Sequence, residues 1–208
     1  MGRYIPDEVF QRLNVSRESL NRLETYVDLL LTWQAKINLI GPSTIEDAWQ
    51  RHVLDGLQLL PLMPSKTGIV ADLGSGAGIP GLVVALGGGY QTYLYESNGK
   101  KAAFLREAIR LTKANAVVHQ IRLEALNDHL PAKLPRYVTA RALAPLDRLL
   151  GLASPFLKRG ATGLFHKGQD VDSEVTEATK TWKIGAIKHP SMTDSRACIL
   201  ELEGIVGV

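Results

Sequence analysis

The sequence has few of the residues on which disulfides, thiolate metal clusters and membrane spans depend. Its 208 residues include one cysteine, Cys198, which excludes an intramolecular disulfide and a metal cluster held by several thiolates. Histidines and carboxylates show no spacing typical of metal ligands, so we predict no metal site. No apolar run approaches the ~20 residues that cross a bilayer, and the first residues lack the apolar stretch of a secretory signal. We therefore expect a cytoplasmic protein without a membrane partner.

A strong charge of one sign is also lacking. Lysine and arginine number 24 against 21 acidic residues, which gives a net charge of +3 at pH 7. This mildly basic balance permits a nucleic-acid partner, but many metabolic enzymes share it. Hydrophobic residues make up 45% of the chain, enough for a substantial core, and this excludes a disordered protein. The length fits one domain with a small appended subdomain.

The first third of the chain has a helical pattern. Apolar residues recur at intervals of three and four, which is typical of the buried face of an amphipathic helix. They are Leu20, Leu23, Val27, Leu30 and Leu31. A break at Gly41 and Pro42 separates this helix from a second one, expected over residues 45–60. We predict that residues 1–64 form an N-terminal helical extension and that residues 65–208 form one compact core unit.

From residue 69 onward, short apolar runs alternate with helical patterns. Six runs are predicted as strands, over residues 69–73, 90–96, 116–121, 137–140, 161–165 and 196–203. Helices are expected over residues 100–113 and 146–157. Strands that alternate with helices of this length form parallel βαβ units. This part of the chain is therefore predicted to be an α/β structure with a doubly wound sheet.

The strongest functional signal is a glycine-rich turn after the first predicted strand. Residues 70–81 read VADLGSGAGIPG, a buried strand followed by alternating Gly74, Gly76 and Gly78 and then by a helix. Glycines allow the unusual dihedrals and the close approach to a ligand that such a turn requires. Pro80 suits the first turn of the following helix, because no amide donor is lost there. We interpret the turn as a ligand-binding loop.

Two ligands compete for this loop. Gly76, Gly78 and Gly81 match the dinucleotide fingerprint, and Glu96 follows about 20 residues later, where a ribose-binding acid is expected. Asp72 argues against a dinucleotide, because a carboxylate so close to the turn repels a pyrophosphate. S-adenosylmethionine (SAM) has no phosphate, and its sulfonium and ammonium groups favour a nearby acid. We therefore predict SAM, and not NAD, as the cofactor.

Three further segments end at the same edge of the predicted sheet. Glu96 closes the second strand, where its carboxylate can bind both hydroxyls of a ribose. Leu123 and Glu124 follow the third strand and could meet an adenine, with a plain surface loop as the alternative. Arg141 follows the fourth strand and could hold either the carboxylate of SAM or a substrate phosphate.

Together these motifs resemble the RsmG family of bacterial methyltransferases, whose older name is glucose-inhibited division protein B. The resemblance runs from about residue 38 to the C-terminal end. Its markers are Asn38-Leu39, Arg51-His52-x-Leu54-Asp55, the glycine-rich turn, Glu96-Ser97 before Gly99-Lys100-Lys101, Ala140-Arg141-Ala142 and Lys167-Gly168.

The resemblance implies a Rossmann-like SAM-dependent methyltransferase fold, with a doubly wound, mostly parallel seven-stranded sheet behind the helical extension. It implies methylation of guanine N7 in 16S rRNA, with the small ribosomal subunit or its assembly intermediate as partner and S-adenosylhomocysteine as product. The predicted cofactor-binding residues, from the turn and from the family's contacts, are Asp72, Gly74, Gly76, Gly78, Ile79, Glu96, Leu123, Glu124 and Arg141. A SAM-dependent enzyme for another RNA or for a small molecule is the alternative.

Guanine N7 has a free lone pair and no hydrogen, so we predict no general base. Such an enzyme can act by holding the reacting atoms ~3 Å apart and by excluding water. The candidates for positioning the substrate are Asn38, Arg51, His52, Asp55 and Lys167. For Asn38, His52 and Asp55, a hydrogen bond that joins the extension to the core is an equally good interpretation. Lys167 could meet an rRNA phosphate or be a solvated surface lysine. We expect a monomer.

Overall fold

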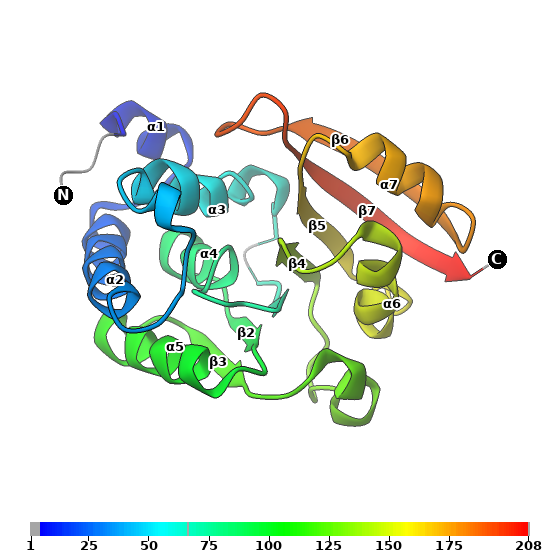
Figure 1. The fold of residues 1–208 in the computed structure, drawn as a ribbon, viewed down its shortest axis with the longest axis horizontal. Coiled ribbons are helices and arrows are strands. Elements are labelled where there is room, and N and C mark those ends of the chain that lie inside the picture. Colours follow the sequence, from blue (N-terminus) through cyan, green and yellow to red (C-terminus); the bar gives the residue numbers. More distant parts are fainter. Residues whose placement is uncertain (1–4, 66, 208) are drawn as a thin grey trace.

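The strands form one sheet with helices on both faces in the computed structural model, which describes residues 5–65 and 67–207 (Figure 1). The strands are β1 (Val70–Leu73), β2 (Thr92–Tyr95), β3 (Ala116–His119), β4 (Tyr137–Arg141), β5 (Thr162–Lys167), β6 (Trp182–Pro190) and β7 (Cys198–Gly207). Their order in the sheet is β3-β2-β1-β4-β5-β7-β6. Strands β1 to β5 pair in parallel, whereas β7 is antiparallel to both of its neighbours. The predicted doubly wound, mostly parallel seven-stranded sheet is confirmed.

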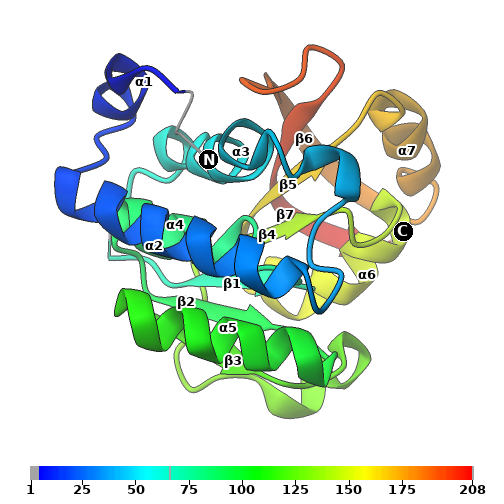
Figure 2. The same cartoon turned by 60° about the vertical axis from the view of Figure 1, so that its left-hand side comes forward.

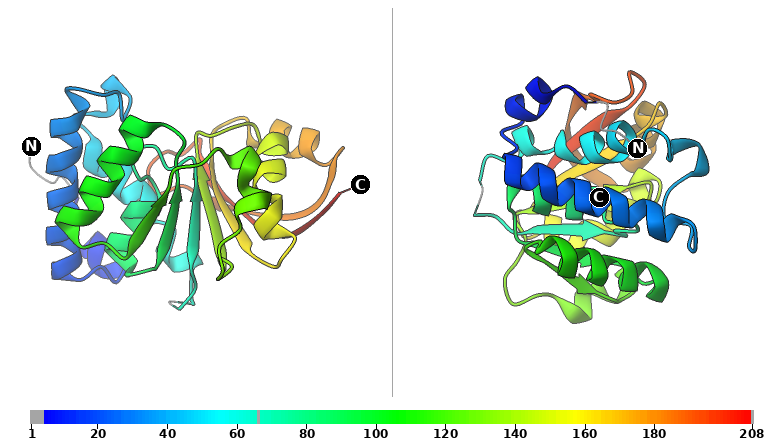
Figure 3. Two further views of the ribbon diagram at one scale, coloured as in Figure 1. Left: turned by 90° about the horizontal axis from the view of Figure 1, so that it is seen from below. Right: turned by 90° about the vertical axis from the view of Figure 1, so that its left-hand side faces the viewer.

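Helices cover both faces of the sheet (Figure 3). They are α1 (Asp7–Arg12), α2 (Arg17–Gln34), α3 (Asp55–Leu57), α4 (Gly81–Gly88), α5 (Gly99–Thr112), α6 (Leu146–Leu157) and α7 (Val171–Ala178). Helical turns of the 3-10 or π type are η1 (Pro42–Thr44), η2 (Trp49–Leu54), η3 (Leu60–Leu62) and η4 (Leu123–His129). One apolar cluster joins α2, α4 and α5, and a second joins α6 and α7 to β4, β5 and β7. The interior strand β1 is buried along its whole length between them, which explains why its residues are apolar except for Asp72.

The N-terminal helices pack onto one helical layer of the sheet. Helix α2 lies beside α4 and α5 (Figure 2). It begins at Ser16, whose Oγ accepts a hydrogen bond of 3.1 Å from the amide of Ser19. On its buried face, Tyr26 donates a hydrogen bond of 2.9 Å to the carbonyl of Ala77 in the glycine-rich turn. The extension therefore supports the turn directly.

The helix expected over residues 45–60 is shorter than predicted. Regular helical structure begins near Trp49 as the π-helical turn η2 and continues as α3 to Leu57. A π-helical turn widens the helix and leaves backbone groups to bond elsewhere, often at functional sites. Here the carbonyl of Arg51 accepts a hydrogen bond of 2.8 Å from Arg141 Nη1, at the end of β4.

Strand β6 and helix α7 were not among the elements predicted from the sequence. Most residues of β6 are exposed or half-buried, because this strand lies at the edge of the sheet. Its polar and helix-breaking residues, including Lys183, Lys188 and Pro190, are typical of an edge strand that discourages pairing with other chains. Apolar residues alternate only in its first half, at Trp182 and Ile184, before an irregularity in the strand, so the apolar pattern is too short to indicate a strand of this length.

Candidate active site

The glycine-rich turn leaves the end of β1 in a conformation that glycine alone adopts easily. Gly74, Gly76 and Gly78 have φ angles of +66°, +55° and +88°. The turn is tied to the end of β2, because the amide of Ser75 donates a hydrogen bond of 3.0 Å to the carbonyl of Tyr95. A Cβ on Gly76 would have no neighbour closer than 3.8 Å. The space beside Gly76 is therefore free for a ligand.

Asp72 lies beneath the turn and not in a cavity. Its side chain is only 1% exposed, and Oδ1 accepts a hydrogen bond of 2.7 Å from Thr139 Oγ1. A Cβ on Gly81 would come within 2.4 Å of the Asp72 side chain, so a glycine is required above it. Burial raises the pKa of Asp72 to about 6, against the opposing hydrogen bonds. Its described contacts are with the protein, and the contact with the cofactor that the sequence predicts stays a prediction.

Glu96 connects the turn to the end of β2. Its carboxylate accepts one hydrogen bond of 2.8 Å from the amide of Gly76 and another of 2.7 Å from the amide of Asn98. The residue is 8% exposed and borders a cavity. Its two oxygens thus lie at the sheet edge where a ribose was expected, held in place by backbone donors.

A cavity of about 320 Å³ lies along this edge of the sheet, and we call it the cofactor pocket. The predicted residues that line it are Gly74, Gly76, Glu96, Leu123 and Glu124. Tyr95 also lines it, and its hydroxyl has no hydrogen-bond partner among residues 5–65 and 67–207. Of the other predicted cofactor residues, Asp72, Gly78, Ile79 and Arg141 do not line this pocket. Gly78 instead leaves room for Leu82, which a Cβ would approach to 2.7 Å.

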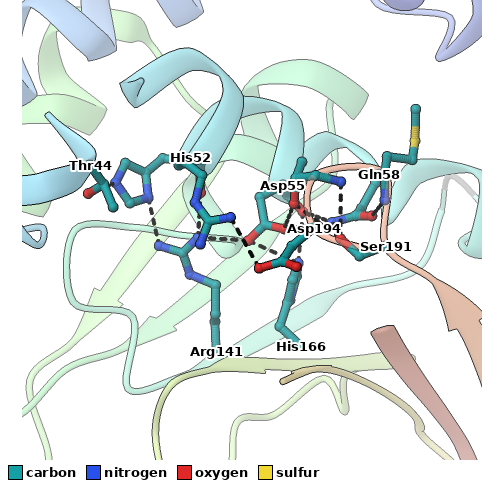
Figure 4. A network of polar contacts seen from close by, with 11 residues as sticks. Thr44, His52, Asp55, Gln58, Arg141, His166, Ser191 and Asp194 are labelled. Atoms are coloured by element: carbon teal, nitrogen blue, oxygen red, sulfur yellow. Dashed lines mark hydrogen bonds and ion pairs between the residues drawn. The ribbon is translucent and has the colours of Figure 1, made fainter. Parts of the chain in front are cut away.

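Arg141 binds the helical extension (Figure 4). Its Nη1 donates hydrogen bonds of 2.8 Å to the carbonyl of Arg51 and 2.7 Å to Asp55 Oδ2. Its Nη2 lies 2.8 Å from His52 Nδ1. The predicted contact of Arg141 with SAM or with a phosphate stays a prediction. In the structure its guanidinium bonds to η2 and α3, and so joins the extension to β4.

The contacts of His52 define its protonation state. A guanidinium can only donate, so His52 Nδ1 must accept from Arg141. On the other side, Nε2 lies 2.8 Å from Thr44 Oγ1, whose own proton goes to the carbonyl of Gly41. The imidazole is therefore neutral, with its hydrogen on Nε2. Burial and the neighbouring Arg141 lower its pKa to about 4, in agreement with this assignment.

Asp55 is the centre of the same network. Oδ1 accepts hydrogen bonds of 2.7 Å from Gln58 Nε2 and 2.8 Å from Thr193 Oγ1. Burial opposes ionisation of Asp55, but His166, Arg141 and these hydrogen bonds together lower its pKa below the usual value. His166, on β5, binds the Asp55 carbonyl at 2.7 Å. Asp55 thus joins α3 to β4, to β5 and to the loop before β7.

A second and larger cavity, of about 610 Å³, adjoins this network; we call it the basic pocket. The predicted residues that line it are Arg51, His52, Asp55, Arg141 and Lys167. Both pockets are lined by the same three residues after β4, namely Ala142, Leu143 and Ala144. The two cavities therefore meet at one short segment.

Two of the predicted substrate-positioning residues differ from expectation. Lys167 is 7% exposed, so it is not a solvated surface lysine, and its Nζ binds the Ala144 carbonyl at 3.0 Å. Asn38 lines neither pocket. Its Oδ1 accepts a hydrogen bond of 3.3 Å from Gln34 at the end of α2. This bond lies within the extension and does not join it to the core, and the substrate role of Asn38 stays a prediction.

The sequence did not identify several residues of the basic pocket. They are Thr44, His166, Glu174, Thr193 and Asp194. They come from segments far apart in the chain and belong to no motif of fixed spacing. Among the described residues there is no group of three or more side chains suited to hold a metal ion, and no helix long and apolar enough to cross a membrane.

The sheet order and the pocket beside the turn define the class of Rossmann-like methyltransferases. The fold is similar to that of a putative transferase from Pyrococcus horikoshii, with a TM-score of 0.57 and 15% identity over 84% of this chain and 67% of that one. It is also similar to the ribosomal protein L11 methylase of Lactobacillus delbrueckii, with a TM-score of 0.56 and 19% identity over 72% and 75%. The M. jannaschii TYW2 structure, in complex with AdoMet, has a TM-score of 0.54 and 15% identity over 84% and 80%.

Within that class, the chain belongs to the GidB family, rRNA small subunit methyltransferase G, whose family profile matches residues 19–200. It is 48% identical over 200 residues to the ribosomal RNA small subunit methyltransferase G of Paramagnetospirillum magneticum, a match that covers 96% of each protein. The Rhodospirillum rubrum protein of the same name is 47% identical, over 95% of this chain and 96% of its own. The chain is thus a SAM-dependent rRNA methyltransferase, as the resemblance implied.

Proposed function

We propose that the protein transfers a methyl group from SAM, bound in the cofactor pocket, to N7 of a guanosine of 16S rRNA in the basic pocket. The observation that carries this proposal is the contact of the two pockets at residues 142–144. A donor on one side and a base on the other would meet there. Family membership supports the rRNA substrate.

The cofactor pocket suits SAM by its shape and by an acceptor for the ribose hydroxyls. Gly76 leaves open space, and Glu96 has a carboxylate at the wall. We assign Gly74, Gly76, Glu96, Leu123 and Glu124 to direct contact, and Asp72, Gly78 and Ile79 to shaping the turn beneath it. SAM supplies a methyl group made electrophilic by its sulfonium, and no metal is needed for its transfer.

The basic pocket suits a nucleotide of folded RNA. Arg51, Arg141 and Lys167 line it, and each forms an ion pair with a carboxylate of the same lining, Asp194, Asp55 and Glu174 respectively. Arg51 is the most exposed of the three cations, with 43% of its side chain exposed, and is therefore the one best placed to meet a phosphate. The guanine N7 lone pair needs no deprotonation. The protein's contribution is thus to orient the base against the donor and to exclude water. We infer that a monomer acts on the small ribosomal subunit or on an assembly intermediate of it.

The test is methyl transfer from tritiated SAM to 30S subunits, naked 16S rRNA, 50S subunits and free GTP. We expect label in the 30S or 16S samples alone, and 7-methylguanosine in the digested RNA by mass spectrometry. Label in a different modified base would overturn the N7 assignment. Transfer to the 50S subunit or to GTP, with none to the 30S subunit or 16S rRNA, would overturn the proposed substrate.

A further inference from the structure

Lys167 lines the basic pocket, but its ammonium is bonded to other groups of the protein. It ends β5, and its side chain is only 6% exposed. Its Nζ donates hydrogen bonds of 3.0 Å to the carbonyl of Ala144 and of 2.6 Å to Glu174 Oε2. A buried ammonium needs such partners, because desolvation without them is costly. The ion pair therefore fixes the ammonium against the segment that follows β4.

Glu174 binds the same segment from helix α7. The oxygen that pairs with Lys167 also accepts a hydrogen bond of 2.6 Å from the amide of Leu146. Leu146 is the first residue of α6, and the preceding Pro145 provides no side-chain cap. A carboxylate at a helix N-terminus satisfies a free amide and interacts favourably with the helix dipole. Glu174 thus caps α6 from outside that helix.

We call residues 142–145 the dividing loop. Lys167 bonds to this loop at Ala144, and Glu174 bonds to Leu146, the residue that directly follows it. Ala142 has a φ of +50°, a conformation that non-glycine residues adopt at a cost and that needs support from its surroundings. Leu143 lies so close to the glycine-rich turn that a Cβ on Gly74 would come within 2.6 Å of Leu143 Cδ1. The loop therefore has little freedom on the cofactor side, and on the other side it is held through Ala144 and Leu146.

We propose that Lys167 and Glu174 are positioning residues that hold the dividing loop where the methyl group passes from one pocket to the other. This inference rests on the proposed function. Neither residue needs to touch the cofactor for this role, since they act through Ala144 and Leu146. Their loss displaces the loop and so separates donor and base, and a displacement of about 1 Å can lower a rate about a hundredfold.

The experiment compares Glu174→Ala and Lys167→Met with the control Glu177→Ala. Glu177 also lies on α7 and also pairs with a lysine, Lys180, but both side chains of this pair are 66% exposed and neither lines the two pockets. Each variant is assayed for kcat and KM with 30S subunits, for the salt dependence of KM, and for amide hydrogen exchange at Leu146. We expect both anchor variants to lower kcat ten- to a hundredfold, with KM and its salt dependence nearly unchanged. In Glu174→Ala, exchange at Leu146 should be at least about tenfold faster.

Three results would separate this inference from its rivals. If Lys167 acts as an rRNA phosphate contact, Lys167→Met raises KM and flattens its salt dependence, while Glu174→Ala keeps its kcat; the inference is then wrong. It is equally wrong if both anchor variants match Glu177→Ala in kcat and in Leu146 exchange. A wild-type protein that methylates no rRNA overturns the proposed function, and the Leu146 exchange still tests the anchor.

Discussion

The cofactor pocket and the basic pocket meet at one loop but are built by different means. The backbone shapes the cofactor pocket: three glycines have left-handed φ angles, and two backbone amides hold the Glu96 carboxylate. The basic pocket takes its shape from side chains of distant segments, joined through Arg141, His52 and Asp55. The cofactor pocket should therefore be sensitive to added side-chain volume. The basic pocket should be sensitive to the loss of hydrogen bonds and to protonation of its side chains.

The largest effect is expected from added volume in the cofactor pocket. In Gly76→Val, the side chain enters the space beside the turn, and a β-branched residue is strained at a φ of +55°. Binding of S-adenosylhomocysteine, measured by calorimetry, should weaken at least about a hundredfold, which corresponds to ~3 kcal/mol.

The matched control is Gly89→Val. Gly89 has a φ of +74° with nothing within 4 Å of a Cβ, and it lies at the far end of α4. This variant should lose stability through similar backbone strain but should bind S-adenosylhomocysteine normally. If both variants bind alike, the glycine-rich turn is not the cofactor site.

The same contrast explains which residues could be predicted from the sequence. The turn, Glu96 and the segment at Leu123 were found because each directly follows an apolar strand, and parallel strands end at one edge of the sheet. His166 and Thr193 were missed because their partner Asp55 is more than a hundred residues away in the chain. No local pattern encodes a hydrogen bond across such a distance.

The next largest effect is expected from Arg141→Ala. This change removes the donors to Asp55 and His52 and leaves a buried carboxylate without its guanidinium. The free energy of unfolding should fall by about 2–3 kcal/mol, measured by urea denaturation. Methyl transfer should fall as well, because the extension loses its tie to β4.

An exposed arginine provides the comparison for Arg141. Arg110 pairs with Glu107 on the surface of α5, and Arg110→Ala should change the stability little. An equally small loss in Arg141→Ala would show that the network does not hold the extension. A loss of transfer at full stability would instead indicate direct contact with a substrate or cofactor.

Protonation of His52 should give a smaller, pH-dependent effect. Its pKa is about 4 in the folded protein and 6.5 for a histidine free in solution, so between these values the unfolded chain binds more protons. Stability therefore falls as the pH drops from 6.5 towards 4. From pH 7 to pH 5 the wild type should lose about 2 kcal/mol more than His52→Gln.

The comparison with His52→Gln is needed because Asp72 acts in the opposite sense. With its pKa raised to about 6, Asp72 stabilises the protein at low pH and loses this contribution as the pH rises through 6. Asp72 is present in both proteins, so its effect cancels in the difference. Parallel stability curves for the two proteins would show that folding does not shift the pKa of His52, and would contradict the assignment of a neutral, bonded imidazole.

The fold was more predictable than the basic pocket, and its errors have physical causes. The strands buried on both faces, such as β1 and β4, have mostly apolar sequences that indicate their positions. Strand β6 was not predicted because it lies at the edge of the sheet, where most of its residues are exposed and burial imposes little pattern on the sequence. The shortened second helix was not predicted because the carbonyl of Arg51 in its π-helical turn is bonded to Arg141, a residue of β4 that is distant in the sequence.

The smallest effect should come from Tyr26→Phe, which tests the one side-chain bond described between the extension and the glycine-rich turn. Tyr26 is fully buried, and its hydroxyl donates to the carbonyl of Ala77. Its loss should cost about 1 kcal/mol of stability and weaken S-adenosylhomocysteine binding a few-fold. Tyr90→Phe, whose hydroxyl bonds to Met63 away from the turn, should cost similar stability without a change in binding. Equal binding in both variants would mean that the backbone alone keeps the shape of the turn. The cofactor pocket would then need no side-chain hydrogen bond from the extension, unlike the basic pocket.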